Sequence, residues 1–577
     1  MTLAGPAPHV AGVMRHRLNG RRERPDPERL IERIREGTIG DDAVLDGPFG
    51  PRRLVYADAT ASGRSLGFIE DIIRGRVLPT YGNTHTEASA TGRRTTALRE
   101  DARRIIHRAV GGSEEDTVVF CGSGATAAID KLIRLLELHQ GPRPVVFVGP
   151  YEHHSNELPW RESAVDVVTI AQDADGRVDV DHLEYELRRH ADRPRKLGSF
   201  SAASNVTGIV TDVDSVAIAL HRHGALALFD YAAAAPYLPI EMNPVPAIPD
   251  GQLAYKDAVF LSPHKFPGGP GTPGVLVAKR RLLRAAVPTV PAGGTVLFVS
   301  PTAQAYHPDP EVREEAGTPA IVESIRAGLV FALREAVGVE VIRRREHDLA
   351  RRTLRSLAAN PRIEILGPTG AERLAVVSIG LRSSEGLLHA NFVAAVLSDL
   401  FGIQARSGCF CAGPYIHRAY PIDDAWSKHM HAEAVRGRLG ARLAFTRLSF
   451  PYYTSDESLA YVLAAVHLLA GEGWKLLPDY RFDPETGLWE HRARVACDDR
   501  LAAMLDAPPP PFDHAPESVL AGQLEAAKEI VRTAGERRDT SLVGLRRRGE
   551  RSVPHRWFAL PDACTPATNG SGAPRGR

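Results

Sequence analysis

The sequence predicts an α/β protein in which a large unit with a mostly parallel sheet flanked by helices is followed by a smaller α+β unit. Short β-rich runs alternate with helical patterns from Asp116 to Lys279, which is typical of parallel strands joined by helices. From about residue 340 to residue 470 the pattern becomes helix, strands, helix, strand and a closing helix. A chain of 577 residues is long enough for at least two domains.

The predicted elements follow in order along the chain. Residues 1–26 are rich in Pro and Arg and are expected to form a flexible tail, and residues 27–37 carry the first amphipathic helical pattern. The large domain is expected at 27–335, with strands in DTVVF, PVVFVG, VDVVTI, KLGSFS, ALALFD, DAVFLS and GVLVAK. The small α+β domain is expected at 336–470, and 471–577 is expected to be a partly disordered C-terminal extension.

Composition and charge argue against two classes of partner. The formal net charge is +1, which gives no reason to expect binding to nucleic acid or to an anionic membrane. No apolar run reaches membrane-spanning length, and the N-terminus lacks the apolar core of a signal peptide. Five cysteines, an odd number in a long chain, suit reduced thiols. We therefore expect a cytoplasmic protein.

Polar residues cluster where five of the predicted strands end. Ligands of open α/β sheets bind beyond the carboxyl ends of the strands, so the loops that follow these strands are expected to converge. The loops read CGSGATAAID, PYEHHSN, AASNVTG, DYAA and SPHK. Together they supply a Gly-rich helix start, two histidines, an asparagine, an aspartate and a lysine.

Pyridoxal phosphate (PLP) chemistry requires this set of groups. The cofactor's aldehyde needs an amine with a lowered pKa, which Lys265 can provide. The pyridine nitrogen needs a carboxylate such as Asp230, and the phosphate needs a helix N-terminus such as the one after GSGAT. His153 or His154 is placed to stack on the ring. We therefore interpret Lys265 as the Schiff-base amine.

Each of these residues also has an ordinary structural interpretation. A lysine after a strand is usually a solvated surface residue, an aspartate there is commonly a cap, and paired loop histidines are commonly structural. GSGATA also matches the dinucleotide fingerprint G-x-G-x-x-A, which would indicate an oxidoreductase. That fingerprint requires an acidic residue at the end of the next strand, whereas Glu152 follows a Gly-Pro break. The joint placement therefore favours PLP.

Seven features occur in the order, and at about the distances, that are seen in a known family. They are YGNTHTEASATGRRT, EHHSN, SNVTG, Asp230, SPHK, EEAGTP and RSGCFCAGP. In this combination the chain resembles the class V aminotransferase family of fold type I PLP enzymes. Within that family it is most similar to group II cysteine desulfurases, to selenocysteine lyases and to the N-terminal domain of molybdenum cofactor sulfurases. The resemblance covers about residues 50–470 and implies a fold type I PLP-dependent enzyme.

The resemblance implies a role for each matching residue. Lys265 would form the Schiff base, His153 would stack on the ring and Asp230 would pair with the pyridine nitrogen. Asn205 would lie near the cofactor's phenolic oxygen and the substrate carboxylate, which Arg447 would bind. The residues that would hold the phosphate are Thr126, Ser262 and His264.

Two further motifs bear on assembly and on the reaction. Thr318 in AGTP resembles the residue that family members donate to the phosphate of the neighbouring subunit, which implies a homodimer. Cys411 in RSGCFCAGP stands where the desulfurase cysteine takes sulfur from the substrate as a persulfide, and Arg406 and His417 are its basic neighbours. We expect desulfuration of L-cysteine or an analogue, with a protein sulfur acceptor as a further partner. Cys409 is a candidate resolving or protecting thiol.

Some features leave the reaction open. Ala233 replaces the glutamine that hydrogen-bonds the phenolic oxygen in many relatives, and the segment after the cysteine loop does not match ordinary desulfurases. The alternatives are a lyase or epimerase that uses Lys265 without a persulfide, and a sulfur-carrier or scaffold protein that keeps only the fold. No metal site is expected, because two cysteines are too few for structural zinc and the histidines of SKHMHAEA do not share a helix face.

Overall fold

A computed structural model of the protein describes residues 26–383, 386–420, 422–494, 503–506, 512–536 and 558. The flexible tail predicted at 1–26 falls outside the described residues except for Asp26. The Asp26 carboxylate accepts a hydrogen bond from the N–H of Glu28 at 3.1 Å and so caps the first helix, α1 (Pro27–Glu36).

A seven-stranded sheet forms the centre of the large unit, in the strand order β4-β10-β9-β8-β7-β5-β6. Its strands are β4 (Asp116–Cys121), β5 (Val145–Val148), β6 (Asp166–Thr169), β7 (Lys196–Ser201), β8 (Leu226–Asp230), β9 (Ala258–Leu261) and β10 (Gly274–Lys279). β10 runs antiparallel to β4 and β9, and the other neighbouring strands are parallel. The mostly parallel sheet and its seven predicted strands are therefore confirmed.

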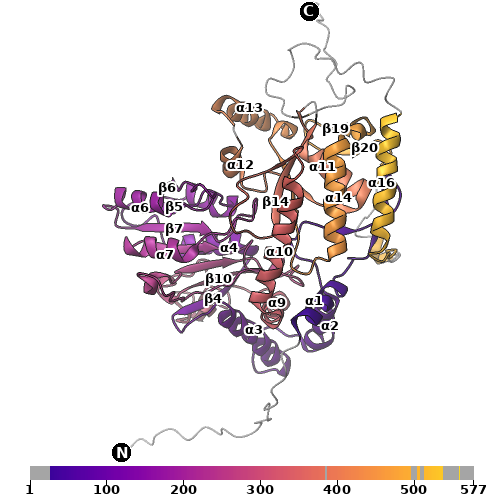
Figure 1. Ribbon diagram of the computed structural model, residues 1–577. Coiled ribbons are helices and arrows are strands. Elements are labelled where there is room, and N and C mark those ends of the chain that lie inside the picture. Colours follow the sequence, from indigo (N-terminus) through magenta and orange to yellow (C-terminus); the bar gives the residue numbers. More distant parts are fainter. Residues whose placement is uncertain are drawn as a thin grey trace, which may run out of the picture.

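Helices cover both faces of this sheet (Figure 1). In β4, Val118 and Phe120 belong to the hydrophobic cluster that includes α7 and α9, whereas Val119 belongs to the cluster that includes α4. The covering helices include α3 (Ala90–Ala109), α4 (Gly124–Leu135), α6 (Val180–Arg189), α7 (Val213–Arg222) and α9 (Ile321–Val337). Strands that are buried on both faces need apolar side chains on both, which explains their nearly continuous apolar sequences.

A second, antiparallel sheet forms the core of the smaller unit, in the order β13-β14-β18-β17, with β15 paired to β14. Its strands are β13 (Ile363–Ile365), β14 (Val376–Ser383), β15 (Gly386–Leu387), β17 (Arg406–Gly408) and β18 (Phe445–Ser449). The helices that share its hydrophobic cluster include α10 (Val339–Ala358), α11 (Ala390–Phe401) and α14 (Asp456–Glu472). This arrangement agrees with the α+β unit predicted from the sequence.

Part of the C-terminal extension folds onto the small unit. It contains the 3-10 helix η8 (Gly473–Asp479), the hairpin of β19 (Tyr480–Phe482) and β20 (Trp489–His491), and α16 (Val519–Glu536). α16 lies alongside α14 (Figure 1), and its Leu520, Ala527 and Val531 are buried in the small unit's hydrophobic cluster. This helix was not predicted from the sequence. Most of the remaining extension lies outside the described residues.

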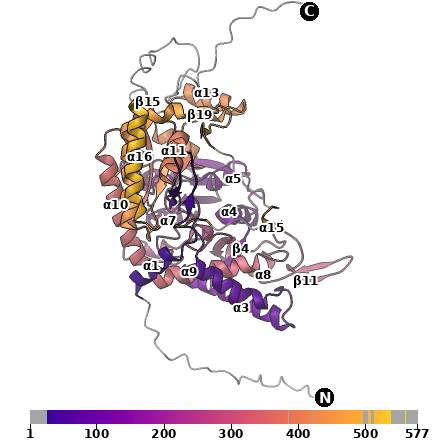
Figure 2. The same ribbon diagram turned by 90° about the vertical axis from the view of Figure 1, so that its right-hand side faces the viewer.

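A hairpin projects from the body of the molecule (Figure 2). It consists of β11 (Val296–Val299) and β12 (Gln304–Tyr306), and Leu297, Phe298 and Val299 are 60–63% exposed.

The other strands and α-helices are β1 (Val44–Leu45), β2 (Arg52–Arg53), β3 (Val55–Tyr56), β16 (Ile403–Gln404), α2 (Gly67–Ile72), α5 (Leu158–Arg161), α8 (Pro310–Arg313), α12 (Gly413–Ala419), α13 (Asp424–Val435) and α15 (Ala503–Asp506).

The domain boundaries placed at 335/336 and 470/471 stay predictions. Within the described ranges, no helix combines the length and the apolar character needed to cross a membrane. The same residues contain no group of three or more His, Cys, Asp or Glu side chains arranged to hold a metal ion.

Candidate active site

A cavity of about 480 Å³ lies at the carboxyl ends of the central strands. Loops that follow β4, β5, β7, β8 and β9 contribute to its walls, and the small unit contributes Arg406, Phe410 and Arg447. The sequence-predicted residues that line it are Thr126, His153, Asn205, Asp230, Ser262, His264, Lys265 and Arg447. Thr318 and Cys411, by contrast, are not among its lining residues.

Lys265 and Asp230 place an amine and a carboxyl group in the same cavity. Lys265 ends the short 3-10 helix η5 directly after β9. Burial lowers the pKa of its amine to about 8; the carboxyl of Asp230 opposes this shift and the guanidinium of Arg447 adds to it. Asp230 is buried, and its Oδ1 accepts a hydrogen bond from the backbone N–H two residues later at 2.7 Å. Burial raises the pKa of this carboxyl group. Lys265 is therefore far easier to deprotonate than an ordinary lysine.

His153 presents a neutral ring to the cavity. It lies just before the short helix η3 (His154–Asn156), and its Nδ1 accepts a hydrogen bond from the N–H of Ser155 at 3.1 Å. Burial, followed by the positive charge of Lys265, lowers the pKa of His153 to about 3. Ser155 Oγ lies 2.7 Å from Thr126 Oγ1, which ties this segment to the start of α4. A flat, uncharged ring is suited to stacking on a planar ligand.

The N-terminus of α4 forms a cradle lined by backbone. Gly124 has a φ of +55°, and a Cβ atom built there would lie 2.9 Å from Ser262 Oγ and 3.2 Å from His264 Cε1. Ser262 Oγ accepts a hydrogen bond from the N–H of Ala125 at 2.8 Å. Because N–H groups at a helix start and the positive end of the helix dipole favour anions, this cradle suits a phosphate group.

Arg447 is buried in β18 and joins three parts of the site. Its Nη1 donates to the carbonyl oxygen of Asn205 at 2.9 Å, and its Nη2 donates to Oδ1 of Asp58 at 2.6 Å. Its guanidinium carbon lies 5.1 Å from the centre of the Phe410 ring. The side-chain amide of Asn205 in turn donates to the carbonyl oxygen of Phe410 at 2.7 Å. These contacts tie the cysteine loop to the wall of the cavity.

The cysteine loop lies at the rim of the cavity. Phe410 lines the cavity, whereas Cys409 and Cys411 are half-buried beside it and are free thiols. Arg406 lines the cavity too, and its Nη2 lies 4.0 Å from Cys411 Sγ. Arg406 of β17 and Arg447 of β18 are directly paired across the small sheet. Arg406 therefore connects the Cys411 thiol to the cavity.

Two residues singled out from the sequence lie apart from the cavity. Thr318 is exposed, and its Oγ1 accepts a hydrogen bond from the side-chain amide of Asn83 at 3.1 Å. His417 is also exposed, and its Nδ1 lies 3.3 Å from Ser427 Oγ. The structure therefore gives His417 no contact with the Cys411 thiol.

The match to known proteins spans most of the fold. Residues 55–462 match the aminotransferase class-V family. The chain belongs to this family. Two curated relatives carry the name probable cysteine desulfurase. One, from Streptomyces coelicolor, is 28% identical over 386 residues, covering 65% of this chain and 86% of the relative. The other, from Staphylococcus aureus, is 29% identical over 385 residues, covering 65% and 87%.

Solved structures agree with this class-V assignment. The apo structure of cysteine desulfurase from Thermococcus onnurineus has a TM-score of 0.61 and 25% identity, covering 72% of this chain and 95% of that one. The cysteine desulfurase CsdA from Escherichia coli has a TM-score of 0.58 and 23% identity, covering 76% and 97%, a likeness that shows the fold. The predicted fold type I architecture is therefore confirmed.

Several cavity residues of this class-V protein were not predicted from the sequence. Ser201 is the last residue of β7 and is paired with Asp230 of β8. Its position at the carboxyl end of a strand is the signal that could have identified it. Thr60, Ala61 and Phe410 also line the cavity. No local pattern marks the first two, because packing between distant segments brings them there.

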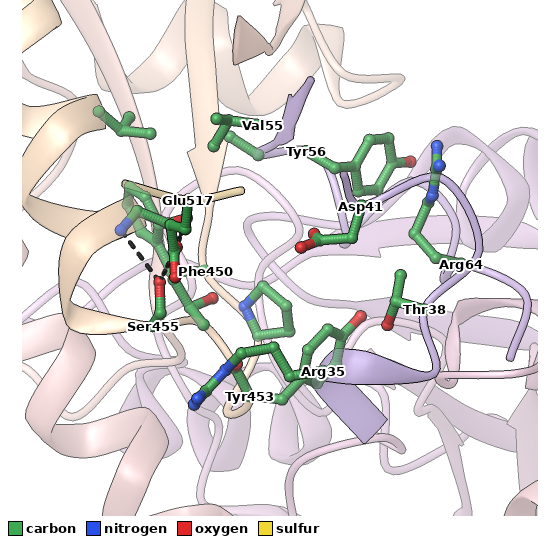
Figure 3. A pocket seen from close by; sticks show the side chains of 15 residues that line it. Arg35, Thr38, Asp41, Val55, Tyr56, Arg64, Phe450, Tyr453, Ser455 and Glu517 are labelled. Atoms are coloured by element: carbon green, nitrogen blue, oxygen red, sulfur yellow. Dashed lines mark hydrogen bonds between the residues drawn. The ribbon is translucent and has the colours of Figure 1, made fainter. Parts of the chain in front are cut away.

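A second, much smaller cavity lies between the N-terminal segment, the end of β18 and the C-terminal extension (Figure 3). Its volume is about 40 Å³, room for about one water molecule. Arg35 Nε donates to the carbonyl oxygen of Tyr453 at 2.9 Å, and the hydroxyls of Ser455 and Ser458 donate to the carboxylate of Glu517. The first contact joins the N-terminal segment to the small unit and the other two fasten the extension to the body of the class-V fold, so we interpret this cavity as structural.

Proposed function

We propose that this chain is a PLP-dependent cysteine desulfurase-like enzyme that removes sulfur from L-cysteine or a close analogue through a persulfide on Cys411. The observation that carries the proposal is the arrangement of Lys265, Asp230 and the α4 cradle around one cavity. Membership of the class-V family and the names of the curated relatives support the same reaction class.

The cavity fits PLP. Asp230 is a buried carboxyl group with a raised pKa and no cationic side chain within hydrogen-bond distance among the described residues. A protonated pyridine nitrogen would supply the missing positive partner. At the other end, the space that a Cβ atom of Gly124 would fill lies between Ser262 and His264, where a phosphate would meet N–H and hydroxyl groups. When bound, the cofactor supplies an electron sink for the carbon skeleton of the substrate.

Side chains of the cavity would bind the cofactor, transfer a proton and hold the substrate. Lys265 Nζ, with its lowered pKa, would bind the cofactor's aldehyde carbon and then carry the proton of the substrate's Cα. His153 would cover one face of the ring with a neutral imidazole. Arg447 and the side-chain amide of Asn205, both in the cavity wall, would hold the substrate carboxylate.

Cys411 would receive the sulfur. Its thiolate attacks the sulfur atom of the substrate, an S–S bond forms, and the C–S bond breaks with its electron pair moving to the substrate carbon. That carbon takes up a proton, so cysteine becomes alanine and Cys411 becomes a persulfide. The nearness of Arg406, with Nη2 4.0 Å from Cys411 Sγ, supports this role because a cation stabilises a thiolate. An acceptor thiol would then remove the terminal sulfur, which supports a reducing, cytoplasmic setting.

We also propose a homodimer in which Thr318 serves the partner's site. The hydroxyl of Thr318 is exposed and lies outside the cavity of its own chain, and the nearby hairpin exposes Leu297, Phe298 and Val299. Sedimentation of the holoenzyme tests the assembly. Mixing Thr318→Ala subunits with Lys265→Ala subunits tests the shared site: it should restore one complete site per mixed dimer, and no recovery of PLP affinity would contradict it.

The function is tested by an absorbance spectrum and by sulfide release from L-cysteine in the presence of a thiol reductant. We expect a visible cofactor band that disappears in Lys265→Ala, and sulfide release that is lost in Cys411→Ser and kept in the matched control Cys409→Ser. Turnover that survives Cys411→Ser would favour the lyase or epimerase alternative. If the wild type shows no cofactor band, PLP dependence is refuted, and the alternative of a sulfur-carrier or scaffold protein is favoured.

A further inference from the structure

The cysteine loop adopts a backbone conformation that requires support from outside the loop. Phe410 and Cys411 have φ values of 53° and 55°, two consecutive non-glycine residues in the left-handed region. Such conformations persist where the surroundings hold them in place, and they concentrate at functional sites. The N–H of Ala412 closes the turn on the carbonyl oxygen of Cys409 at 2.9 Å, but that bond is internal to the loop. The contacts that anchor the loop must therefore come from other segments.

One residue of the large unit holds the loop at two points, at Cys411 and at Gly413. The backbone N–H of His154 donates to the carbonyl oxygen of Cys411 at 2.6 Å. The Nε2 of the same residue accepts a hydrogen bond from the N–H of Gly413 at 3.0 Å. A Cβ atom at Gly413 would lie 3.4 Å from that Nε2, which is van der Waals contact. His154 thus spans from the cofactor side of the cavity to the small unit.

The contact at Nε2 requires a neutral His154 ring that carries its proton on Nδ1. Nε2 can accept a hydrogen bond only when it carries no proton. Burial lowers the pKa of His154, with Glu157 opposing and Arg161 adding to the shift, and a lowered pKa favours the neutral ring. His154 directly follows His153, which lines the cavity. His153, which is proposed to cover the cofactor ring, and His154, which binds the cysteine loop, are therefore adjacent in the chain.

We infer that His154 is a positioning residue: its side-chain bond to Gly413 holds the Cys411 thiol in place at the rim of the cofactor cavity. This inference rests on the proposed function, because it assigns His154 to the placement of the sulfur-accepting thiol. The backbone N–H that donates to Cys411 is kept in every substitution at position 154 except proline, so side-chain variants isolate the contribution of Nε2.

The test compares His154→Ala with His154→Gln in the holoenzyme. The glutamine side chain can place an acceptor oxygen where Nε2 lies, whereas alanine removes the acceptor. His417→Ala is the matched control, because His417 is four residues beyond Gly413 and its ring contacts Ser427 instead of the loop. The cofactor spectrum checks that each variant keeps an intact site. Hydrogen–deuterium exchange of the peptide covering 406–416 reports the loop itself, independently of turnover.

In His154→Ala we expect exchange at the Gly413 amide to accelerate roughly 5- to 10-fold, as expected for the loss of one hydrogen bond. Formation of the Cys411 persulfide, followed by mass spectrometry as the gain of one sulfur atom, should slow on the order of 100-fold with KM nearly unchanged. His154→Gln should recover most of both properties, and His417→Ala should match the wild type.

Unchanged exchange in His154→Ala would overturn the inference, as would a normal persulfide rate or a glutamine variant as slow as the alanine variant. Failure of the underlying function gives a different result. If Cys411→Ser still releases sulfide at the wild-type rate, the persulfide role is wrong whatever the His154 variants do.

Discussion

Arg447 donates a hydrogen bond from Nη2 to Oδ1 of Asp58 at 2.6 Å, so the arginine proposed to bind the substrate carboxylate already has a carboxylate beside it. Its Nε is buried and has no hydrogen-bond partner among the described residues. The removal of Arg447 from water lowers the pKa of its guanidinium, and Asp58 acts against this shift. Asp58 therefore both steadies Arg447 and competes with a substrate for its charge.

Asp58→Asn should lower KM for L-cysteine by roughly 3- to 10-fold, a change that corresponds to about 0.7–1.4 kcal/mol. The amide oxygen of asparagine still accepts the bond from Arg447, whereas the negative charge that repels the substrate carboxylate is gone. Initial rates of alanine formation measure the effect, with the exposed Asp71→Asn as the control. An unchanged or increased KM would show that Asp58 acts only as a support.

Loading of the apoprotein with PLP should depend on pH through Lys265. A lowered pKa means that the amine loses its proton at a lower pH than an ordinary lysine. With a pKa of about 8, about one amine in ten is neutral at pH 7, compared with about one in 3000 for an unperturbed lysine. The rate of appearance of the cofactor band should therefore rise about tenfold per pH unit up to pH 8 and then level off. A rise that continues to pH 10 would contradict the lowered pKa.

Gly124→Ala should weaken PLP binding by at least about tenfold, because the new Cβ would lie 2.9 Å from Ser262 Oγ, inside the space proposed for the phosphate. Gly141→Ala is a matched control: Gly141 also has a positive φ, of 75°, but a Cβ there meets nothing within 4 Å. Fluorescence titration of each apoprotein with PLP gives the dissociation constants. Equal affinities for the two variants would show that the N-terminus of α4 does not bind the phosphate of PLP.

Glu315→Ala should lower the free energy of unfolding by about 3–5 kcal/mol, because it removes the one buried carboxylate that pairs with both Arg99 and Arg103 and leaves them only the half-exposed Glu100 and, for Arg103, Glu311. Glu315 accepts hydrogen bonds from Arg103 at 2.9 and 3.0 Å, from Arg99, and from the N–H of Phe120 at 2.7 Å. The exposed Glu323→Ala should change stability by less than about 0.5 kcal/mol. Denaturant titration of the apoproteins, followed by circular dichroism, compares the two. A loss of under 1 kcal/mol in Glu315→Ala would be inconsistent with the buried ion pair.

The strands and the central part of the site could be predicted because their signals are local. An apolar run with turn residues at both ends marks a strand wherever it lies, so the seven strands of the large sheet were predicted correctly. The carboxyl ends of parallel strands share one edge of a sheet, and this rule alone brings Lys265, Asp230 and the start of α4 into one cavity. By contrast, α16 was not predicted, although its burial against the small unit depends on an ordinary amphipathic pattern.

The sequence by itself determined the fold class, the family and the residues that carry the proposed cofactor chemistry. Each of these rests on a short motif or on the hydrophobic periodicity of a single helix or strand. The tertiary structure alone decided which distant groups meet: Asp58 with Arg447, and His154 with Gly413. These contacts join residues 389 and 259 positions apart, and no local pattern specifies them. The His154–Gly413 contact follows from how the small unit packs against the large one, and the Asp58–Arg447 contact follows from the pairing of the segment around Asp58 with β18. Both arrangements are fixed by the cooperative burial of many side chains.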